Sequence, residues 1–167
     1  LKHDIKRAFY MLDWDFVFKI FNMFGFDDTF ISSMKTVFAS SHISVLVNGS
    51  PEGYFSYYRG FRHGDPLSAI IFSISKYYLS RFLSIMAANG KLKAIGAGRG
   101  LSAPTHSFYA DDLIIFTQGD KRNIKNIKKY LFHNEEVLGQ KVCWNKSFVY
   151  IGRNISTFEK VGIISDL

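Results

Sequence analysis

Two adjacent carboxylates, Asp111 and Asp112, are the clearest candidates for chemistry in this chain of 167 residues. Apolar and aromatic residues lead into the pair (Phe108-Tyr109-Ala110) and out of it (Leu113-Ile114-Ile115-Phe116), which predicts a strand, a tight turn and a strand. Two carboxylates about 4 Å apart repel by about 4 kcal/mol at an effective dielectric near 20, and a divalent cation relieves that repulsion. The pair therefore indicates metal chemistry on phosphates, with an ordinary solvated turn as the alternative.

A third carboxylate, Asp4, strengthens the metal interpretation, as does the segment Arg62-His63-Gly64-Asp65-Pro66-Leu67-Ser68. Asp4 can share a site with Asp111 only if the fold returns the later strand beside the first one. A layer of mixed helices and sheet does this, and adjacent central strands would let three carboxylates bridge two Mg²⁺ ions. Such a cluster is what nucleotidyl transfer to a primer 3′-hydroxyl requires.

Composition limits the other possibilities. With 47% hydrophobic and 17% aromatic residues, the chain is a folded domain and not a disordered segment. Its 21 Lys and Arg against 14 Asp and Glu give +7, which favours a partner that carries phosphates. The single cysteine and five histidines without paired spacing exclude a disulfide framework and a zinc site, so we expect a reducing, intracellular setting.

Helical periodicity and capping residues predict the elements around these motifs. Helices are expected from a cap at Asp13 to Gly25, from near Asp28, from Asp65-Pro66 to Asn89-Gly90, and from about Lys121 to Leu138. Strands are expected at 43–47 and 54–58 around an Asn48-Gly49 turn, and a turn and strand at 140–150. The stripes predicted to be buried include Phe24, Phe30, Val37 and Ile70.

Two further segments have more than one interpretation. The glycine-rich stretch 96–100 lacks the Lys-Ser/Thr ending of a phosphate-binding loop, which favours a flexible connection. The last predicted helix carries Lys121, Lys125, Lys128 and Lys129. For these lysines a solvated basic face is favoured over a contact with nucleic acid.

The motifs resemble those of a reverse transcriptase palm, and most closely the LINE-type (non-LTR) retrotransposon enzymes found in plant genomes. Asp4-Ile5-Lys6-Arg7-Ala8-Phe9 resembles the Asp-x-x-x-Ala-Phe block of that family, and 59–68 resembles its Arg-Gly-x-Arg-Gln-Gly-Asp-Pro-Leu-Ser block. Tyr109-Ala110-Asp111-Asp112 resembles the catalytic hairpin, and 138–147 resembles the Gly-Gln-Lys-Val and Lys-Ser element. The resemblance implies an α+β palm whose antiparallel sheet is backed by helices.

The resemblance also implies roles for individual residues. It implies that the metal ligands and catalytic residues are Asp4, Asp111 and Asp112, with two Mg²⁺ ions (Mn²⁺ being possible) as cofactors. Phe9 would lie beneath the incoming sugar and exclude a ribose 2′-hydroxyl. Arg62, His63 and Gly64 would lie against the template and nucleotide, and Lys146 near the triphosphate, although an exposed strand lysine is the alternative for Lys146. The implied partners are an RNA template, a DNA primer and deoxynucleoside triphosphates.

Several positions depart from the family's pattern. Tyr10 stands where the family usually has Asp, His63 where it has Gln, Ala69 where it has Pro, and Cys143 where it has Asn. Because an imidazole cannot reproduce the paired donor and acceptor of an amide, His63 is the most serious departure. A decayed, catalytically dead copy that still binds nucleic acid is therefore the rival interpretation. Group II intron, telomerase-like and viral RNA-dependent RNA polymerases match less well.

We expect residues 1–167 to be a fragment of a longer polyprotein, namely the palm with part of the fingers. The thumb and an endonuclease domain would lie elsewhere, and the isolated piece would then extend primers poorly or not at all. By resemblance, the full protein would be in a nuclear or cytoplasmic ribonucleoprotein.

Overall fold

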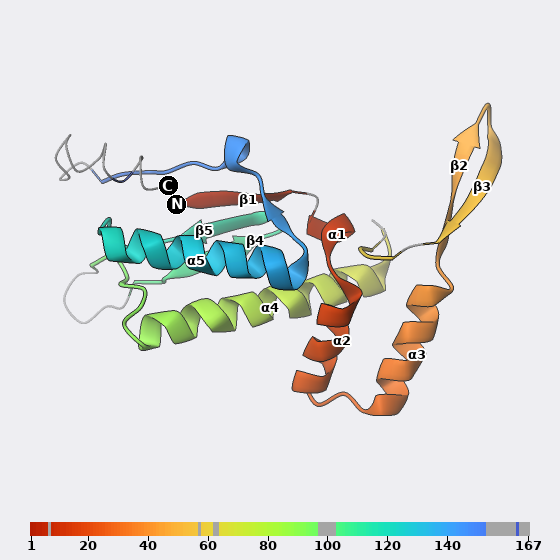
Figure 1. The fold of residues 1–167 in the computed structure, drawn as a ribbon, viewed down its shortest axis with the longest axis horizontal. Coiled ribbons are helices and arrows are strands. Elements are labelled where there is room, and N and C mark those ends of the chain that lie inside the picture. The colour runs from red at the N-terminus through yellow and green to blue at the C-terminus, as the bar shows by residue number, and fades with distance from the viewer. Residues whose placement is uncertain (7, 57, 62–63, 97–102, 153–162, 164–167) are drawn as a thin grey trace.

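The computed structural model describes residues 1–6, 8–56, 58–61, 64–96, 103–152 and 163. Its centre is a four-stranded antiparallel sheet in the order β4-β5-β1-β6 (Figure 1). The strands are β1 (Lys2–Lys6), β4 (His106–Tyr109), β5 (Asp112–Ile115) and β6 (Lys141–Val142). Two long helices, α4 (Pro66–Ala88) and α5 (Lys121–Leu138), lie along this sheet. The predicted α+β fold, an antiparallel sheet backed by helices, is confirmed.

Aspartate caps define where the helices begin. Asp13 accepts a hydrogen bond from the Phe16 amide at 3.0 Å, and Asp120 accepts one from the Asn123 amide at 2.8 Å. Each carboxylate satisfies an amide that the first helical turn leaves without a partner. The caps begin α2 (Trp14–Met23) and α5, while Asp27 caps α3 (Asp28–Ala39) and Asp65 caps α4. The predicted helix starts are confirmed, and a short helix that was not predicted, α1 (Ala8–Met11), follows β1.

Part of the predicted core is exposed, which corrects the sequence analysis. Phe24, Phe30, Val37 and Ile70 are exposed at 47%, 37%, 48% and 57%. The α2–α3 pair stands to one side of the sheet layer, and α2 packs mainly against α3 and α4 (Figure 1). Only the stripe that faces these neighbours is buried, so the apolar residues outside it remain exposed.

A two-stranded hairpin, β2 (His42–Val47) with β3 (Ser50–Ser56), projects from the end of α3 (Figure 1). Asn48 and Gly49 both have positive φ, at 50° and 87°, as the tightest hairpin turn requires. Pairing therefore begins at once, with Val47 opposite Ser50. The prediction that the return strand starts at Tyr54 was wrong because the turn has only two residues.

The segment after α5 also differs from its prediction. Instead of one strand, it forms the two-residue β6 and a 3-10 turn at Trp144–Lys146, followed by a single bridge between Lys2 and Phe148. Among the described residues, no helix is both long and apolar enough to cross a membrane.

The two faces of the sheet differ sharply. On one face His3, Ile5, Leu113 and Ile115 are buried. Residues from both long helices pack with this face, namely Phe72, Leu83, Met86, Ile127, Tyr130 and Leu131. Because side chains alternate along a strand, Asp4 and Asp112 belong to the opposite face, where both are only partly buried.

Candidate active site

The predicted acidic hairpin is present. Strands β4 and β5 pair with Tyr109 opposite Asp112, so Ala110 and Asp111 form a two-residue turn. Ala110 has φ of 47°, in the left-handed region that residues with a Cβ seldom adopt. Such backbone strain is typical of functional turns, because the surrounding structure has to hold the residue in place.

Strand pairing brings Asp4 to the same hairpin. Asp4 lies directly opposite Asp112 in the antiparallel ladder between β1 and β5. The amide of Ile5 donates a hydrogen bond to the carbonyl of Asp111 at 3.0 Å, which ties β1 to the tip of the turn. Opposite residues of an antiparallel pair point to one face, so Asp4 and Asp112 share the face that the long helices leave uncovered.

The three carboxylates do not form a closed metal cage. Within the part of the chain that the structure describes, no three His, Cys, Asp or Glu side chains are grouped closely enough to hold an ion. The structure places Asp4 on β1, Asp112 on the neighbouring strand β5 and Asp111 in the turn between β4 and β5, while the ligand set remains a prediction.

Asp112 forms an ion pair with a lysine side chain. The ammonium of Lys2 lies 2.8 Å from Asp112 Oδ2, and this hydrogen-bonded pair raises the pKa of Lys2 above its ordinary value. Lys2 stands two residues before Asp4 on β1, so the diagonal neighbour across the strands supplies the charge. Carboxylate oxygens are the ligands that Mg²⁺ prefers, and Asp112 is accessible to a cation here, so the donor set fits a divalent ion.

A buried lysine that the sequence analysis did not single out lies on α4, next to Phe108 of this hairpin. Lys76 on α4 is only 7% exposed, and its Nζ atom has no hydrogen-bond partner among the described residues. The ammonium lies over the rings of Phe72 and Phe108, 4.8 and 5.6 Å from their centroids. Burial lowers the pKa of Lys76 to about 8, against the opposing attraction of Asp111. A lone lysine inside the apolar run 70–79 was the available signal.

Phe9 lies on α1, beside the end of β1. Its ring stacks on Phe72 with centroids 4.1 Å apart and planes 16° apart, and its carbonyl accepts a hydrogen bond from the Phe61 amide at 2.9 Å. Packing therefore fixes the ring near the strand that carries Asp4. Its role beneath a sugar stays a prediction.

The other predicted substrate residues are not gathered around the carboxylates. Arg62 and His63 lie outside the described residues. Gly64 is exposed with φ of 87°, immediately before the Asp65 cap of α4. Lys146 is exposed at the end of the 3-10 turn, so its role at the triphosphate also remains a prediction.

Two of the motif segments meet on the backbone of α1 and the residue that follows it. The amide of Gly60 donates to the carbonyl of Leu12 at 2.8 Å, and the side chain of Gln140 donates to the carbonyl of Ala8 at 2.7 Å. Segments far apart in the sequence are thereby fixed around the end of β1. The sequence contained no signal for these contacts, because each of them depends on the tertiary fold.

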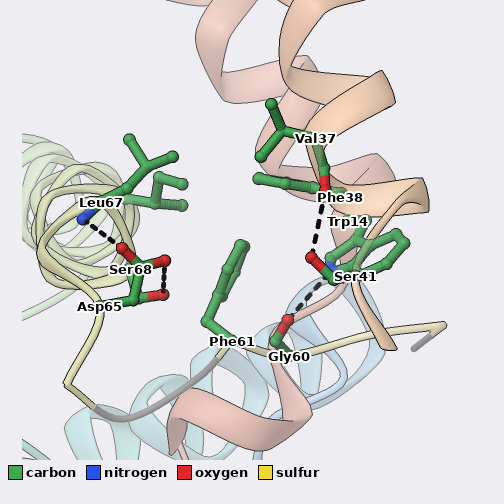
Figure 2. A pocket seen from close by; sticks show the side chains of 10 residues that line it. Trp14, Val37, Phe38, Ser41, Gly60, Phe61, Asp65, Leu67 and Ser68 are labelled. Atoms are coloured by element: carbon green, nitrogen blue, oxygen red, sulfur yellow. Dashed lines mark hydrogen bonds between the residues drawn. The ribbon is translucent and has the colours of Figure 1, made fainter. Parts of the chain in front are cut away.

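A small cavity lies beside the start of α4 and away from the carboxylates (Figure 2). Figure 2 shows the Phe61 ring pointing between Leu67 and the α3 side, with Trp14 hydrogen-bonded to Gly60 and Ser68 to Asp65. The cavity volume is about 50 Å³, room for no more than a few water molecules. It is a packing gap between α2, α3 and α4, too small for a nucleotide.

Comparisons with known proteins agree with this architecture. Residues 1–161 match the family described as reverse transcriptase (RNA-dependent DNA polymerase). The chain is 27% identical over 118 residues to a transposon TX1 149 kDa protein of Xenopus laevis, which covers 71% of the chain and 9% of that protein. It is 25% identical over 115 residues to the Pol polyprotein of the R2DM retrotransposable element of Drosophila melanogaster, covering 69% and 10%.

An uncharacterized mitochondrial protein of Arabidopsis thaliana, AtMg01250, is 31% identical over 71 residues, covering 42% of the chain and 58% of that protein. The chain spans about a tenth of the two transposon proteins and just over half of the Arabidopsis protein. The retrotransposon relatives confirm the predicted LINE-type (non-LTR) resemblance. Reverse transcriptases as a family use divalent metal ions and act on an RNA template with a nucleic-acid primer. From the match over 161 of its 167 residues, this chain belongs to the reverse transcriptase family.

Proposed function

We propose that this chain is the palm of an RNA-directed DNA polymerase from a non-LTR retrotransposon, with the carboxylates of β1 and the β4–β5 turn as its catalytic centre. The observation that carries the proposal is the cross-strand pairing of Asp4 with Asp112 on the uncovered face of the sheet. Asp111 lies in the strained turn between β4 and β5, and its carbonyl accepts a hydrogen bond from the Ile5 amide of β1.

Asp4, Asp111 and Asp112 would hold two Mg²⁺ ions. When bound, these ions lower the pKa of the primer 3′-hydroxyl and neutralise charge on the departing pyrophosphate. The protein's own contribution is to position the carboxylates. Strand pairing fixes where Asp4 and Asp112 lie, and Lys2 forms an ion pair with Asp112.

The proposed substrates are deoxynucleoside triphosphates, added to a DNA primer on an RNA template. We propose that Phe9, on the short helix that follows the strand of Asp4, excludes a ribose 2′-hydroxyl; its ring is held in place by the stack on Phe72. We place the activity in the longer protein, in a nuclear or cytoplasmic ribonucleoprotein, with residues 1–167 as its palm and part of its fingers.

The test replaces the matching segment of an intact related reverse transcriptase with residues 1–167. Mg²⁺-dependent incorporation of dNTPs on an RNA template is then measured for this chimera, for Asp111→Ala and for Asp4→Asn. We expect each substitution to lower incorporation by about 10²-fold or more, because each removes charge on which the transition state depends. The matched control is Asp15→Ala, an exposed carboxylate on α2.

Two outcomes would count against the proposal. If Asp111→Ala leaves incorporation unchanged, Asp111 is not a catalytic residue. If the chimera is inactive but becomes active after His63→Gln, the chain is a decayed copy of a polymerase, as the rival interpretation holds.

The role proposed for Phe9 has its own test in the same chimera. Phe9→Val should admit ribonucleotides, and unchanged sugar selectivity would exclude the role proposed for Phe9.

A further inference from the structure

A groove runs between α4 and α5, on the outer side of the two helices that cover the buried face of the sheet. It is lined by Phe82 and Met86 from α4 and by Arg122, Lys129, Phe132 and His133 from α5, and its volume is about 590 Å³. The carboxylates of the active site belong to the opposite face of the sheet, so this groove is a separate surface.

The groove is basic, and its charges are not neutralised. Lys91, Arg122 and Lys129 line it, and none of them lies within ion-pair distance of a carboxylate in the described part of the chain. Glu136 is the single acidic residue in the lining, and it comes from the last turn of α5. A carboxylate there repels phosphate but can accept a hydrogen bond from a base amino group or a ribose hydroxyl.

Helix stability does not explain the position of Arg122. Arg122 lies in the first turn of α5, which contains no acidic residue beyond the Asp120 cap, and the last turn has no basic residue. The helix dipole favours the reverse, with acidic residues first and basic residues last. The dipole of α5 therefore gives no structural reason for Arg122, whose charge is available to a bound phosphate.

Aromatic rings accompany the cations. Phe132 is 56% exposed, and Phe82 contacts both Tyr130 and His133, with ring centroids 5.5 and 5.8 Å apart. Arginine and lysine beside partly exposed rings is the combination that binds single-stranded nucleic acid, since the cations neutralise phosphates and the rings stack on bases. A duplex keeps its bases stacked inside and cannot use such rings.

We propose that the α4–α5 groove is a second nucleic-acid site. It binds a single-stranded segment of RNA on the side of the molecule away from the catalytic carboxylates. The lining residues from Arg122 to Glu136 span about 20 Å of helix at 1.5 Å per residue, long enough for a short single strand. The choice of RNA over DNA rests on the proposed function, because the template of this polymerase is RNA. The groove would hold a part of that RNA away from the reaction centre.

The test measures binding of the 167-residue chain to a labelled single-stranded RNA of roughly 12 nucleotides, within the usual site size, by fluorescence anisotropy at several salt concentrations. The groove variant is Arg122→Ala with Lys129→Ala. The matched control is Lys121→Ala with Lys125→Ala, which removes the same charge from exposed positions of α5 outside the groove. Circular dichroism confirms that both variants are folded.

We expect the groove variant to lower the slope of log K against log salt by about 1.4, since each phosphate contact of a single strand contributes about 0.7. The control should change that slope by much less. Phe132→Ala should weaken binding about fivefold or more with little change in slope, because it removes stacking and no charge. Lys129→Arg should retain binding.

Crosslinking of an RNA that contains 4-thiouridine, followed by peptide mapping, distinguishes the groove from the active face. Crosslinks within α5 support the proposal, and crosslinks confined to the active face overturn it. Equal effects of the groove and control variants would show general charge attraction and overturn it as well. Preference for DNA of the same sequence, for a duplex, or for a poly-glutamate peptide would each overturn the proposed occupant. A chimera that loses polymerase activity while its α5 crosslinks persist would refute the proposed function and not the groove.

Discussion

The side-chain amide of Gln140 donates a hydrogen bond to the main-chain carbonyl of Ala8 across 2.7 Å, in a fully buried setting. The two residues are 132 positions apart, and the bond joins the end of α5 to the short helix that carries Phe9. Leu138 makes a parallel contact, since its carbonyl accepts from the Asp13 amide at 3.0 Å. The last predicted motif, at 138–147, is thus hydrogen-bonded to Ala8 of the first motif and to Asp13 just after it.

Replacing Gln140 with methionine, which has a similar shape, should destabilise the fold by about 1 kcal/mol or more, because the Ala8 carbonyl loses its partner in a buried place. The free energy of urea unfolding measures this loss. Gln118→Met, at an exposed position, is the control and should change little. The Oε1 atom of Gln140 has no partner among the described residues, so an unchanged or higher stability would mean that removing it outweighs the lost bond.

Gly60 is predicted to tolerate no side chain. It has φ of 75°, and a Cβ added there would overlap the backbone of Tyr10. Gly60→Ala should therefore cost clearly more than the roughly 1–2 kcal/mol of a left-handed conformation alone. Gly25→Ala is the matched control, with φ of 82° and nothing within 4 Å of the added atom. Equal losses of unfolding free energy for the two variants would show that the approach to Tyr10 is not tight.

Ala110→Gly should stabilise the protein by about 1 kcal/mol, since glycine adopts the φ of 47° without the clash that alanine has. Thermal unfolding detects the change. Ala88→Gly, in the last turn of α4, should have the opposite sign because glycine weakens a helix. Destabilisation by Ala110→Gly would argue that the hairpin turn is not strained.

Lys76 predicts an unusual dependence of stability on pH. Its pKa is about 8 in the folded protein and 10.5 in the unfolded chain, because burial disfavours the ammonium. Between these pH values the unfolded state binds more protons, so stability should rise with pH by as much as about 3 kcal/mol, and below pH 8 the full penalty remains.

The measurement for Lys76 is urea unfolding at pH 7, 9 and 10.5 for the parent chain and for Lys76→Met. The variant should be more stable at pH 7 and lose the rise between pH 8 and 10.5. Lys125→Met, an exposed lysine on α5, is the control and should keep the rise. If the parent and Lys76→Met have the same pH profile, Lys76 is solvated in the folded protein.

Local chemistry was enough to predict much of this structure. The caps at Asp13, Asp65 and Asp120 and the Asn48-Gly49 turn depend on interactions within a few residues, so their signals stand side by side in the sequence. The acidic hairpin is of the same kind, because Asp111 and Asp112 are neighbours in a strand-turn-strand pattern. The resemblance of the motifs to a reverse transcriptase rested on these short segments as well.

The sequence analysis expected Asp4 to lie beside the acidic hairpin, but only the tertiary structure decided which distant residues pair and pack. The pairing of Asp4 with Asp112 depends on the register of β1 against β5, and the burial of Lys76 depends on how α4 lies beneath the sheet. The exposure of Val37 and the groove along α5 depend on which helix faces receive a neighbour. A single sequence encodes the periodicity of each element, but the partner of each face is selected by the packing of the whole chain, where side chains far apart along it compete for the same space.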